Sequence, residues 1–173
     1  MNDVSQSVLS RTSVENEEAL VRQWLGSLEA ALREPSASAI SALFVPDSHW
    51  RDLLAFTWSL TPHSGADQIA AAMVRLQATV QSRGFALAKN RIAPRRVRRL
   101  GIDVIEALFD FETAVGRGRG VLRLRADKPA QAWVLSTSLQ ELKGFEENIG
   151  ARRPTGAEFA HNFGGDNWLD KRT

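Results

Sequence analysis

The chain has 173 residues, enough for one domain that buries roughly 70% of the surface of its unfolded chain. Its 22 Lys and Arg residues against 20 Asp and Glu residues give a formal net charge of +2, which offers no support for nucleic-acid or acidic-membrane binding. It has no cysteine, so disulfides, thiolate nucleophiles and thiolate metal ligands are excluded. The polar N-terminus lacks the apolar segment of a signal peptide and no run reaches about 18 apolar residues, so we expect a cytoplasmic protein without a membrane span.

Three helices are predicted in the first half of the sequence. Residues 1–12 are polar and have no hydrophobic period, so they are interpreted as a disordered arm. Over 13–34, apolar residues recur three or four positions apart, which predicts an amphipathic helix that Pro35 ends. A short second helix is expected over 36–45, and the alanine-rich stretch 66–82 predicts a third.

A period of two, typical of strands, precedes and follows the third helix. The first strand is expected to run to about Leu60, where Thr61–Gly65 breaks it. The later strands are predicted over 86–98, 102–115, 119–126 and 130–142. Helices followed by antiparallel strands predict an α+β fold, a cone-shaped curved antiparallel sheet packed on three N-terminal-side helices. This domain is expected over 13–144, and the Gly-rich, charged residues 145–173 are interpreted as a tail or interdomain linker.

The first strand raises a chemical question. Every second residue from Trp50 onward is aromatic or apolar, except for Asp52. If the aromatic side chains surround Asp52 in a pocket between the sheet and the helices, burial would make its carboxylate a stronger base and suit it to general-base catalysis. The residues after Arg51 also allow a turn or bulge, in which the carboxylate would cap backbone N–H groups or pair with an arginine. The residues expected to line the pocket with Asp52 are Trp50, Phe56, Trp58, Phe109, Phe111 and Trp133.

The other titratable residues are weaker candidates. Asp110 is a second carboxylate, but Phe109 and Phe111 define the apolar face of its strand, so Asp110 is expected to point outward. The three histidines lack the spacing of a metal site, and no serine lies in the context of a nucleophile elbow. Neither a metal site nor a catalytic triad is therefore predicted. The histidines are His49, His63 and His161.

Two conspicuous runs have structural explanations. Residues 91–99 contain five arginines without interleaved aromatic residues, so they are interpreted as a solvated outer strand face or a surface for an acidic partner domain. The run Gly116–Gly120 does not fit the dinucleotide-binding pattern G-x-G-x-x-G, because Val121 stands at the last position. It also lies between two strands and has no helix N-terminus to bind a pyrophosphate. We interpret it as a glycine hairpin with a bulge.

The order of elements resembles that of the SnoaL-like, ketosteroid-isomerase-like superfamily, which has the cone-shaped fold of the nuclear-transport-factor type. A narrower resemblance, over roughly residues 15–172, is to the N-terminal region of bacterial and fungal flavin-containing monooxygenase-like oxidoreductases. In those proteins a SnoaL-like domain precedes the nucleotide-binding core. The segments that carry the resemblance are "HWRDLLAFTW", "IEALFDFETAVGRGRGVLRL", "LSTSLQELKGFEENIGARRPTGAEF" and "NWLDKR".

The sequence departs from that group at its end. In the group, a Rossmann strand and a G-x-G-x-x-G turn follow the segment that matches 167–172, whereas this sequence stops at Thr173. We therefore expect no cofactor in this chain. The resemblance implies FAD and NAD(P) only in a C-terminal domain that this sequence does not contain.

Three functions remain open. The first is an accessory, non-catalytic front domain of a flavin-dependent monooxygenase-like oxidoreductase, which offers a ligand pocket or a surface that docks a flavin- or nucleotide-binding domain and forms a homodimer through its outer sheet face. The second is a free-standing cofactorless isomerase, cyclase, dehydratase or hydrolase that uses Asp52 on a small hydrophobic ligand. The third is a ligand-binding or interaction module without chemistry.

Overall fold

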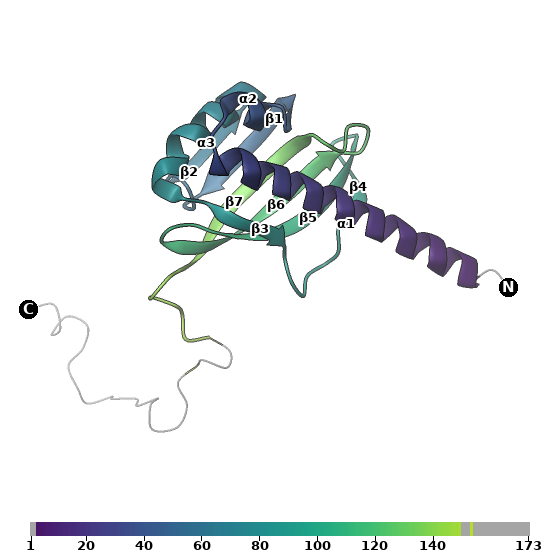
Figure 1. Ribbon diagram of the computed structural model, residues 1–173. Coiled ribbons are helices and arrows are strands. Elements are labelled where there is room, and N and C mark those ends of the chain that lie inside the picture. Colours follow the sequence, from purple (N-terminus) through teal and green to yellow (C-terminus); the bar gives the residue numbers. More distant parts are fainter. Residues whose placement is uncertain (1–2, 150–152, 154–173) are drawn as a thin grey trace, which may run out of the picture.

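In the computed structural model, which describes residues 3–149 and 153, helices cover one face of a curved sheet (Figure 1). The helices are α1 (Asp3–Arg33), α2 (Ala37–Ser41) and α3 (Ala66–Val80). The strands are β1 (Phe44–Leu53), β2 (Leu60–Ser64), β3 (Arg83–Leu87), β4 (Arg95–Arg99), β5 (Ile102–Glu112), β6 (Gly116–Arg125) and β7 (Ala132–Leu142). This arrangement confirms the predicted α+β fold with three helices on a curved sheet. No helix in this part of the chain is long and apolar enough to cross a membrane.

The strand order in the sheet is β2-β1-β7-β6-β5-β3, and β4 pairs with β5 beside β3. Neighbouring strands are antiparallel except β1 and β7, which are parallel. The first and last strands are thus hydrogen-bonded to each other in the middle of the sheet. The prediction of a fully antiparallel sheet was wrong for this one pair.

The core lies between the inner face of the sheet and the helices. On β5, Ile105, Ala107, Phe109 and Phe111 all point inward, as the alternation predicts. The buried stripe of α1 packs against this face, and burying one large apolar side chain is worth about 1.5–3 kcal/mol. The stripe consists of Val21, Trp24, Leu25, Leu28 and Leu32.

Several element boundaries differ from the predictions. The first helix begins at Asp3, so the prediction of a disordered arm was wrong for residues 3–12. The stretch expected to break the first strand forms β2, an edge strand that pairs with β1. Pro62 is compatible with β2 because an edge strand leaves some backbone groups unpaired. The predicted strand over 86–98 is divided into β3 and β4 by residues 88–94.

The glycine run lies inside a strand rather than in a turn. The turn of the β5–β6 hairpin falls at 113–115, and β6 begins at Gly116. Gly118 and Gly120 stand opposite Phe111 and Phe109, and the two phenyl rings occupy the space that a Cβ would need. The register shift near Gly118 adds its extra residue to β7 and not to the glycine run, so the bulge is not where it was expected.

The C-terminal segment is described only in part. Residues 145–149, which follow β7 and its turn, have no helix or strand. Apart from residue 153, the remainder of the predicted tail over 145–173 lies outside the described residues.

Candidate functional site

The Asp52 carboxylate is buried at the end of β1, and donors from its own chain surround it. Oδ2 accepts hydrogen bonds from the backbone N–H groups of Phe56 at 3.0 Å and Thr57 at 2.8 Å, and from the Thr57 hydroxyl at 2.8 Å. Oδ1 accepts a hydrogen bond of 2.7 Å from the Thr137 hydroxyl on β7. All four donors are electrically neutral groups. They satisfy both oxygens without any charged partner.

The loop after β1 folds around this carboxylate. The strand ends at Leu53, and the next residue, Leu54, has φ 68° and donates its N–H to the Ser59 carbonyl at 3.1 Å. Trp58 also has a positive φ, 56°. Left-handed backbone costs a bulky residue about 1–2 kcal/mol. The hydrogen bonds to Asp52 offset that cost, so the capping role that sequence analysis left open for this carboxylate is present.

Four of the predicted pocket residues come together on the inner face next to Asp52. The Trp50 indole donates to the Thr137 hydroxyl at 3.0 Å and meets the Phe56 ring edge-to-face, with centroids 5.1 Å apart. The Phe56 ring lies 5.9 Å from Phe111, whose ring is itself 5.9 Å from that of Phe109.

Phe85 on β3 completes the aromatic layer by stacking on Phe111 with a centroid distance of 5.3 Å. Phe85 was not among the residues predicted for the pocket, because it stands one position before the strand predicted over 86–98. Together with the four rings next to Asp52, it fills the inner face between β1 and β3 with aromatic side chains.

Trp58 and Trp133 do not join this layer. Trp58 lies in the loop after β1, and 59% of it is exposed. Trp133 is buried in a separate cluster with Val45 and Val104. A register shift between β6 and β7 near Leu124 adds one residue to β7 and breaks the alternation that placed Trp133 on the inner face. The expectation that both indoles line a pocket with Asp52 therefore does not match their positions.

His63 is a further polar residue at this face. It lies on β2 opposite Trp50, and its ring stacks on the indole with a centroid distance of 5.0 Å. Burial lowers the pKa of His63 and the positive charge of Arg75 adds to this, while Asp52 opposes it. Among the described residues, neither His63 Nε2 nor Ser48 Oγ, both buried, has a hydrogen-bond partner. Sequence analysis had placed His63 in a turn.

The histidines that the structure describes belong to no group of metal-ligating residues. In the described part of the chain, no group of three or more His, Cys, Asp or Glu residues could hold a metal ion. His49 shares a hydrogen bond of 2.9 Å with the Ser64 hydroxyl, and His161 lies outside the described residues.

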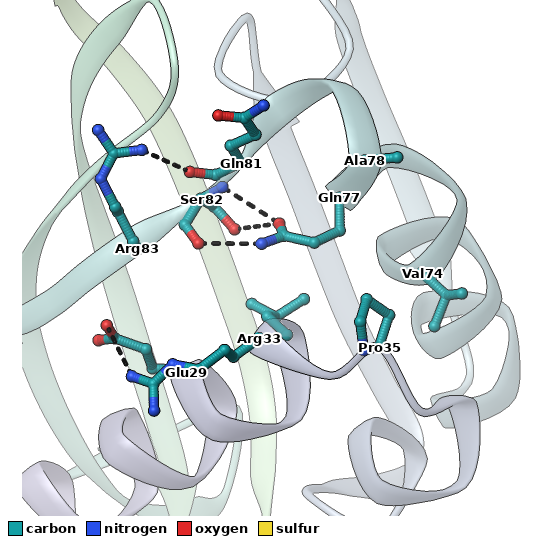
Figure 2. Close-up of a pocket in the computed structure, with 10 residues that line it drawn as sticks. Glu29, Arg33, Pro35, Val74, Gln77, Ala78, Gln81, Ser82 and Arg83 are labelled. Carbon is teal, nitrogen blue, oxygen red and sulfur yellow. Dashed lines mark hydrogen bonds and ion pairs between the residues drawn. The ribbon is translucent and has the colours of Figure 1, made fainter.

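Figure 2 shows a groove of about 500 Å³ between the C-terminal ends of α1 and α3 and the start of β3. Its polar side chains bond to one another: the Gln77 amide donates to the Ser82 carbonyl at 3.0 Å and accepts from the Ser82 hydroxyl at 2.6 Å. Glu29 pairs with Arg33 at 3.8 Å and accepts the Phe85 N–H at 3.0 Å. Neither Asp52 nor the aromatic layer lines this groove.

The outer face of the sheet carries ion pairs. Asp110 points outward, as predicted, and its carboxylate lies 3.0 Å from Arg119. The Glu106 carboxylate, only 13% exposed, contacts Arg99 at 2.7 Å and Arg123 at 2.9 Å. These partners, Arg99 foremost, lower the pKa of Glu106 to about 2 against the opposing effect of burial.

The arginines of the run over 91–99 lie on both faces of β4, because Arg95 stands opposite the outward Glu106 and Arg96 opposite the inward Ile105. Arg96 pairs with Glu17 at 2.8 Å, and Arg95 reaches Glu106 at 3.5 Å. Arg98 lies 4.0 Å from Asp103. Carboxylates of the same chain thus neutralise much of the run, which fits the interpretation as a solvated strand face.

No family model and no curated protein sequence matches the chain. An uncharacterized protein with a cystatin-like fold from Caulobacter vibrioides is similar in structure, with a TM-score of 0.51, 12% identity and coverage of 71% of this chain and 89% of that one. A steroid delta-isomerase from Pseudomonas aeruginosa has a TM-score of 0.41 and 17% identity, with 73% and 84% covered. A SnoaL-like polyketide cyclase from Shewanella denitrificans has a TM-score of 0.41 and 14% identity, with 69% and 89% covered.

At such identities the likeness concerns the fold alone. The chain has the α+β cone fold of the SnoaL-like, ketosteroid-isomerase-like type: a curved, unclosed sheet with a few helices on its inner side. The structures named above give no support for the narrower resemblance to flavin-containing monooxygenases.

Proposed function

We propose that this chain is a non-catalytic SnoaL-like module that acts through contacts with other protein surfaces. The observation that carries the proposal is the set of four hydrogen bonds to Asp52. A general base must lie within hydrogen-bond reach of the proton that it removes. Both oxygens of Asp52 are instead buried against donors that the fold itself needs.

The packing of the inner face supports the same conclusion. The rings of Trp50, Phe56, Phe85 and Phe111 contact one another in series across the space that a ligand would enter. The cavities described in this part of the chain lie elsewhere, and Asp52 lines none of them. A small hydrophobic ligand would have to displace aromatic side chains to reach the carboxylate.

The outer sheet face is the surface proposed for a homodimer. A shallow cavity of about 280 Å³ there includes Ile92, Leu108 and Val121, with the ion pairs of Glu106 and its arginines at its edge. An apolar centre with a rim of both charge signs suits an isologous interface, because each copy offers both members of every charge pair.

The sequence resemblance suggests the class of a second partner, a flavin- and nucleotide-binding oxidoreductase domain. In this reading FAD and NAD(P) bind to that domain and not to the SnoaL-like module. The partner class rests on the sequence segments alone.

A cofactorless enzyme is the second candidate, and one observation favours it. His63 Nε2 and Ser48 Oγ are buried without hydrogen-bond partners in the described part of the chain. Unsatisfied buried groups are rare and often mark functional sites. In this candidate His63 is the base, because its Nε2 has no hydrogen-bond partner among the described residues and its lowered pKa keeps the ring neutral at pH 7.

One set of assays separates the two candidates. The purified chain is incubated with a Δ5-3-ketosteroid, an epoxide and a polyketide-type enone, alongside His63→Gln and Asp52→Asn. We expect no turnover above background and a colourless protein. Turnover that His63→Gln abolishes while circular dichroism stays unchanged would establish the enzyme instead. Stoichiometric flavin in the purified protein would overturn the assignment of the cofactor to another domain.

A second measurement tests the module directly. Sedimentation equilibrium is expected to show a dimer for the wild type and a monomer for Val121→Arg, whose added charge has no partner in an apolar interface centre. A matched change at an exposed apolar residue of the edge strand β2, Leu60→Arg, is expected to leave the dimer intact. A monomeric wild type at 100 µM would contradict the proposed interface.

A further inference from the structure

The carboxylate of Glu106 on the outer sheet face is shared by three arginines. Its Oε1 accepts hydrogen bonds from Arg99 at 2.7 Å and from Arg95 at 3.5 Å. Its Oε2 accepts them from Arg123 at 2.9 Å and again from Arg99 at 3.1 Å. Three positive charges thus surround one negative charge. Two of the three have no carboxylate of their own within ion-pair distance among the described residues.

The neighbouring ion pairs on β6 are balanced. Arg119 contacts Asp110 at 3.0 Å and Arg125 contacts Asp127 at 2.9 Å, one cation to one anion in each case. The surplus of positive charge therefore belongs to the cluster around Glu106 and not to the whole strand. Guanidinium groups held this close repel one another, and a second anion beside them would offset that repulsion.

The arginines of the cluster have donors left for such an anion. A guanidinium group carries five N–H donors. Arg123 donates to Glu106 through Nε, so its two terminal nitrogens have no acceptor among the described residues. Two terminal nitrogens of one guanidinium form a planar fork that matches the two oxygens of a carboxylate. The side chain of Arg123 is 30% exposed, so a ligand can reach it.

An apolar cavity adjoins these donors. It measures about 280 Å³, and Ile92, Leu108 and Val121 form its apolar wall beside the three arginines. Leu108 and Val121 stand opposite each other on β5 and β6, whereas Ile92 belongs to the segment between β3 and β4. Pockets for drug-sized ligands measure about 300–1,000 Å³, so this cavity suits a smaller molecule that has an apolar body and one charged group.

We propose that the cavity binds a small carboxylic acid. The carboxylate of the ligand pairs with the arginines around Glu106, and its apolar part lies against Leu108 and Val121. The ligand would occupy the surface proposed for the homodimer, so the acid and a second copy of the chain compete for it. Binding of the acid goes beyond the proposed function, whereas the competition rests on it.

Isothermal titration calorimetry with 2-naphthoate tests the site. We expect a dissociation constant below about 1 mM, which is ordinary for so small a ligand. In NMR spectra of the complex, NOEs from the ring protons to the methyl groups of Ile92, Leu108 and Val121 are expected to locate the ligand. The control is 2-naphthamide, which has nearly the same shape without the charge. It should bind at least about tenfold more weakly, because it forms no charge-assisted hydrogen bonds.

Two matched variants separate the site from the general charge of the face. Arg119 and Arg123 stand two positions on either side of Val121 on β6, and both face outward. Arg123→Met should weaken binding of 2-naphthoate at least about tenfold. Arg119→Met removes the same charge outside the cavity and should change the affinity less than about twofold. If Arg123→Met lowers the unfolding temperature, Arg95→Met replaces it, since Arg95 contacts Glu106 only at 3.5 Å.

The competition has a measurement of its own. An acid that binds only the free subunit raises the apparent dissociation constant of the dimer about a hundredfold when its concentration is about nine times its own dissociation constant, because both subunits gain a ligand. Sedimentation equilibrium is expected to show this effect with 2-naphthoate and none with 2-naphthamide.

Each possible failure points to a different claim. Equal affinities for 2-naphthoate and 2-naphthamide, or NOEs to other methyl groups only, would overturn the binding site. A dimer that saturating 2-naphthoate leaves unchanged would overturn the competition. A wild type that is monomeric without any ligand would refute the proposed homodimer, and the calorimetry and the NOEs would still decide the site.

Discussion

The two faces of the sheet hold carboxylates in opposite ways. On the inner face, neutral backbone and hydroxyl groups donate to Asp52. On the outer face, the guanidinium groups of Arg99 and Arg123 hold Glu106. A carboxylate that accepts hydrogen bonds from neutral backbone groups fixes the conformation of the loop that carries those groups. A carboxylate that is held by charged groups on long side chains constrains the backbone less, and the main effect of its partners is to lower its pKa. A carboxylate among aromatic side chains is thus not by itself a catalytic group, because its partners decide what it does.

The sharpest test of this contrast is Asp52→Ala, which we expect to have the largest effect. It leaves two buried N–H groups and the Thr137 hydroxyl without their acceptor, so it should lower the free energy of unfolding by about 3–5 kcal/mol. Urea denaturation measures the change. Asp110→Ala is the matched outer-face control, since Asp110 is 43% exposed, and should cost less than about 1 kcal/mol. Similar losses for both variants would contradict the contrast.

The packing of the inner face can also be tested by substituting a glycine that contacts the aromatic side chains. A Cβ at Gly120 would collide with the Phe109 ring and the Ser136 carbonyl, so Gly120→Ala should destabilise the fold by about 2–3 kcal/mol. Thermal unfolding checks this. Gly26→Ala in α1, where a Cβ meets nothing within 4 Å, should instead stabilise the protein by up to about 1 kcal/mol. A neutral Gly120→Ala would mean that the aromatic layer has room to move.

On the outer face, Glu106→Gln should cost about 1–2 kcal/mol at pH 7. The folded-state pKa of Glu106, about 2, lies below its ordinary 4.5, so its ion pairs add stability above pH 4.5 and lose it as the pH falls toward 2. The wild type should therefore lose stability more steeply than Glu106→Gln over that range, as urea denaturation at several pH values would show. Parallel pH profiles would refute the role of Glu106.

The smallest expected effect concerns His63. Its pKa in the folded protein lies below the ordinary 6.5, so the unfolded chain binds a proton more readily and stability falls as the pH drops through and below 6.5. His63→Phe retains an aromatic ring over Trp50 and removes the titration. We expect its unfolding free energy to depend less on pH between 7 and 5 than that of the wild type. An unchanged pH dependence would show that His63 is solvated when charged.

Regular alternation explains why much of the inner face was predictable. Trp50, Asp52, Phe109 and Phe111 lie in stretches of β1 and β5 whose register is continuous, so that every second side chain shares a face. The same rule failed for Trp133, because a one-residue register shift in β7 is set by pairing with β6 and leaves no mark in the local sequence.

The loop after β1 was unpredictable for a different reason. Turns with positive φ are normally signalled by Gly or Asn, and here Leu54 and Trp58 adopt that conformation without such a signal. Only the tertiary contact between Asp52 and Thr137, which are 85 positions apart, closes the set of bonds that holds the loop. The glycine run was misinterpreted because its partners, Phe109 and Phe111, lie on the preceding strand.

The parallel pairing of β1 with β7 has a consequence for biosynthesis. Among the described strands, the hairpin of β1 and β2 is hydrogen-bonded to the rest of the sheet only through β7. The pairing of β1 with β7 begins with Phe44 opposite Ala132. A nascent chain must therefore have almost all of residues 1–142 outside the ribosome before the β1–β2 hairpin can pair with its neighbouring strand, β7. Such a long sequence separation slows folding and leaves strand edges unpaired in the meantime, when a chaperone would have most to protect.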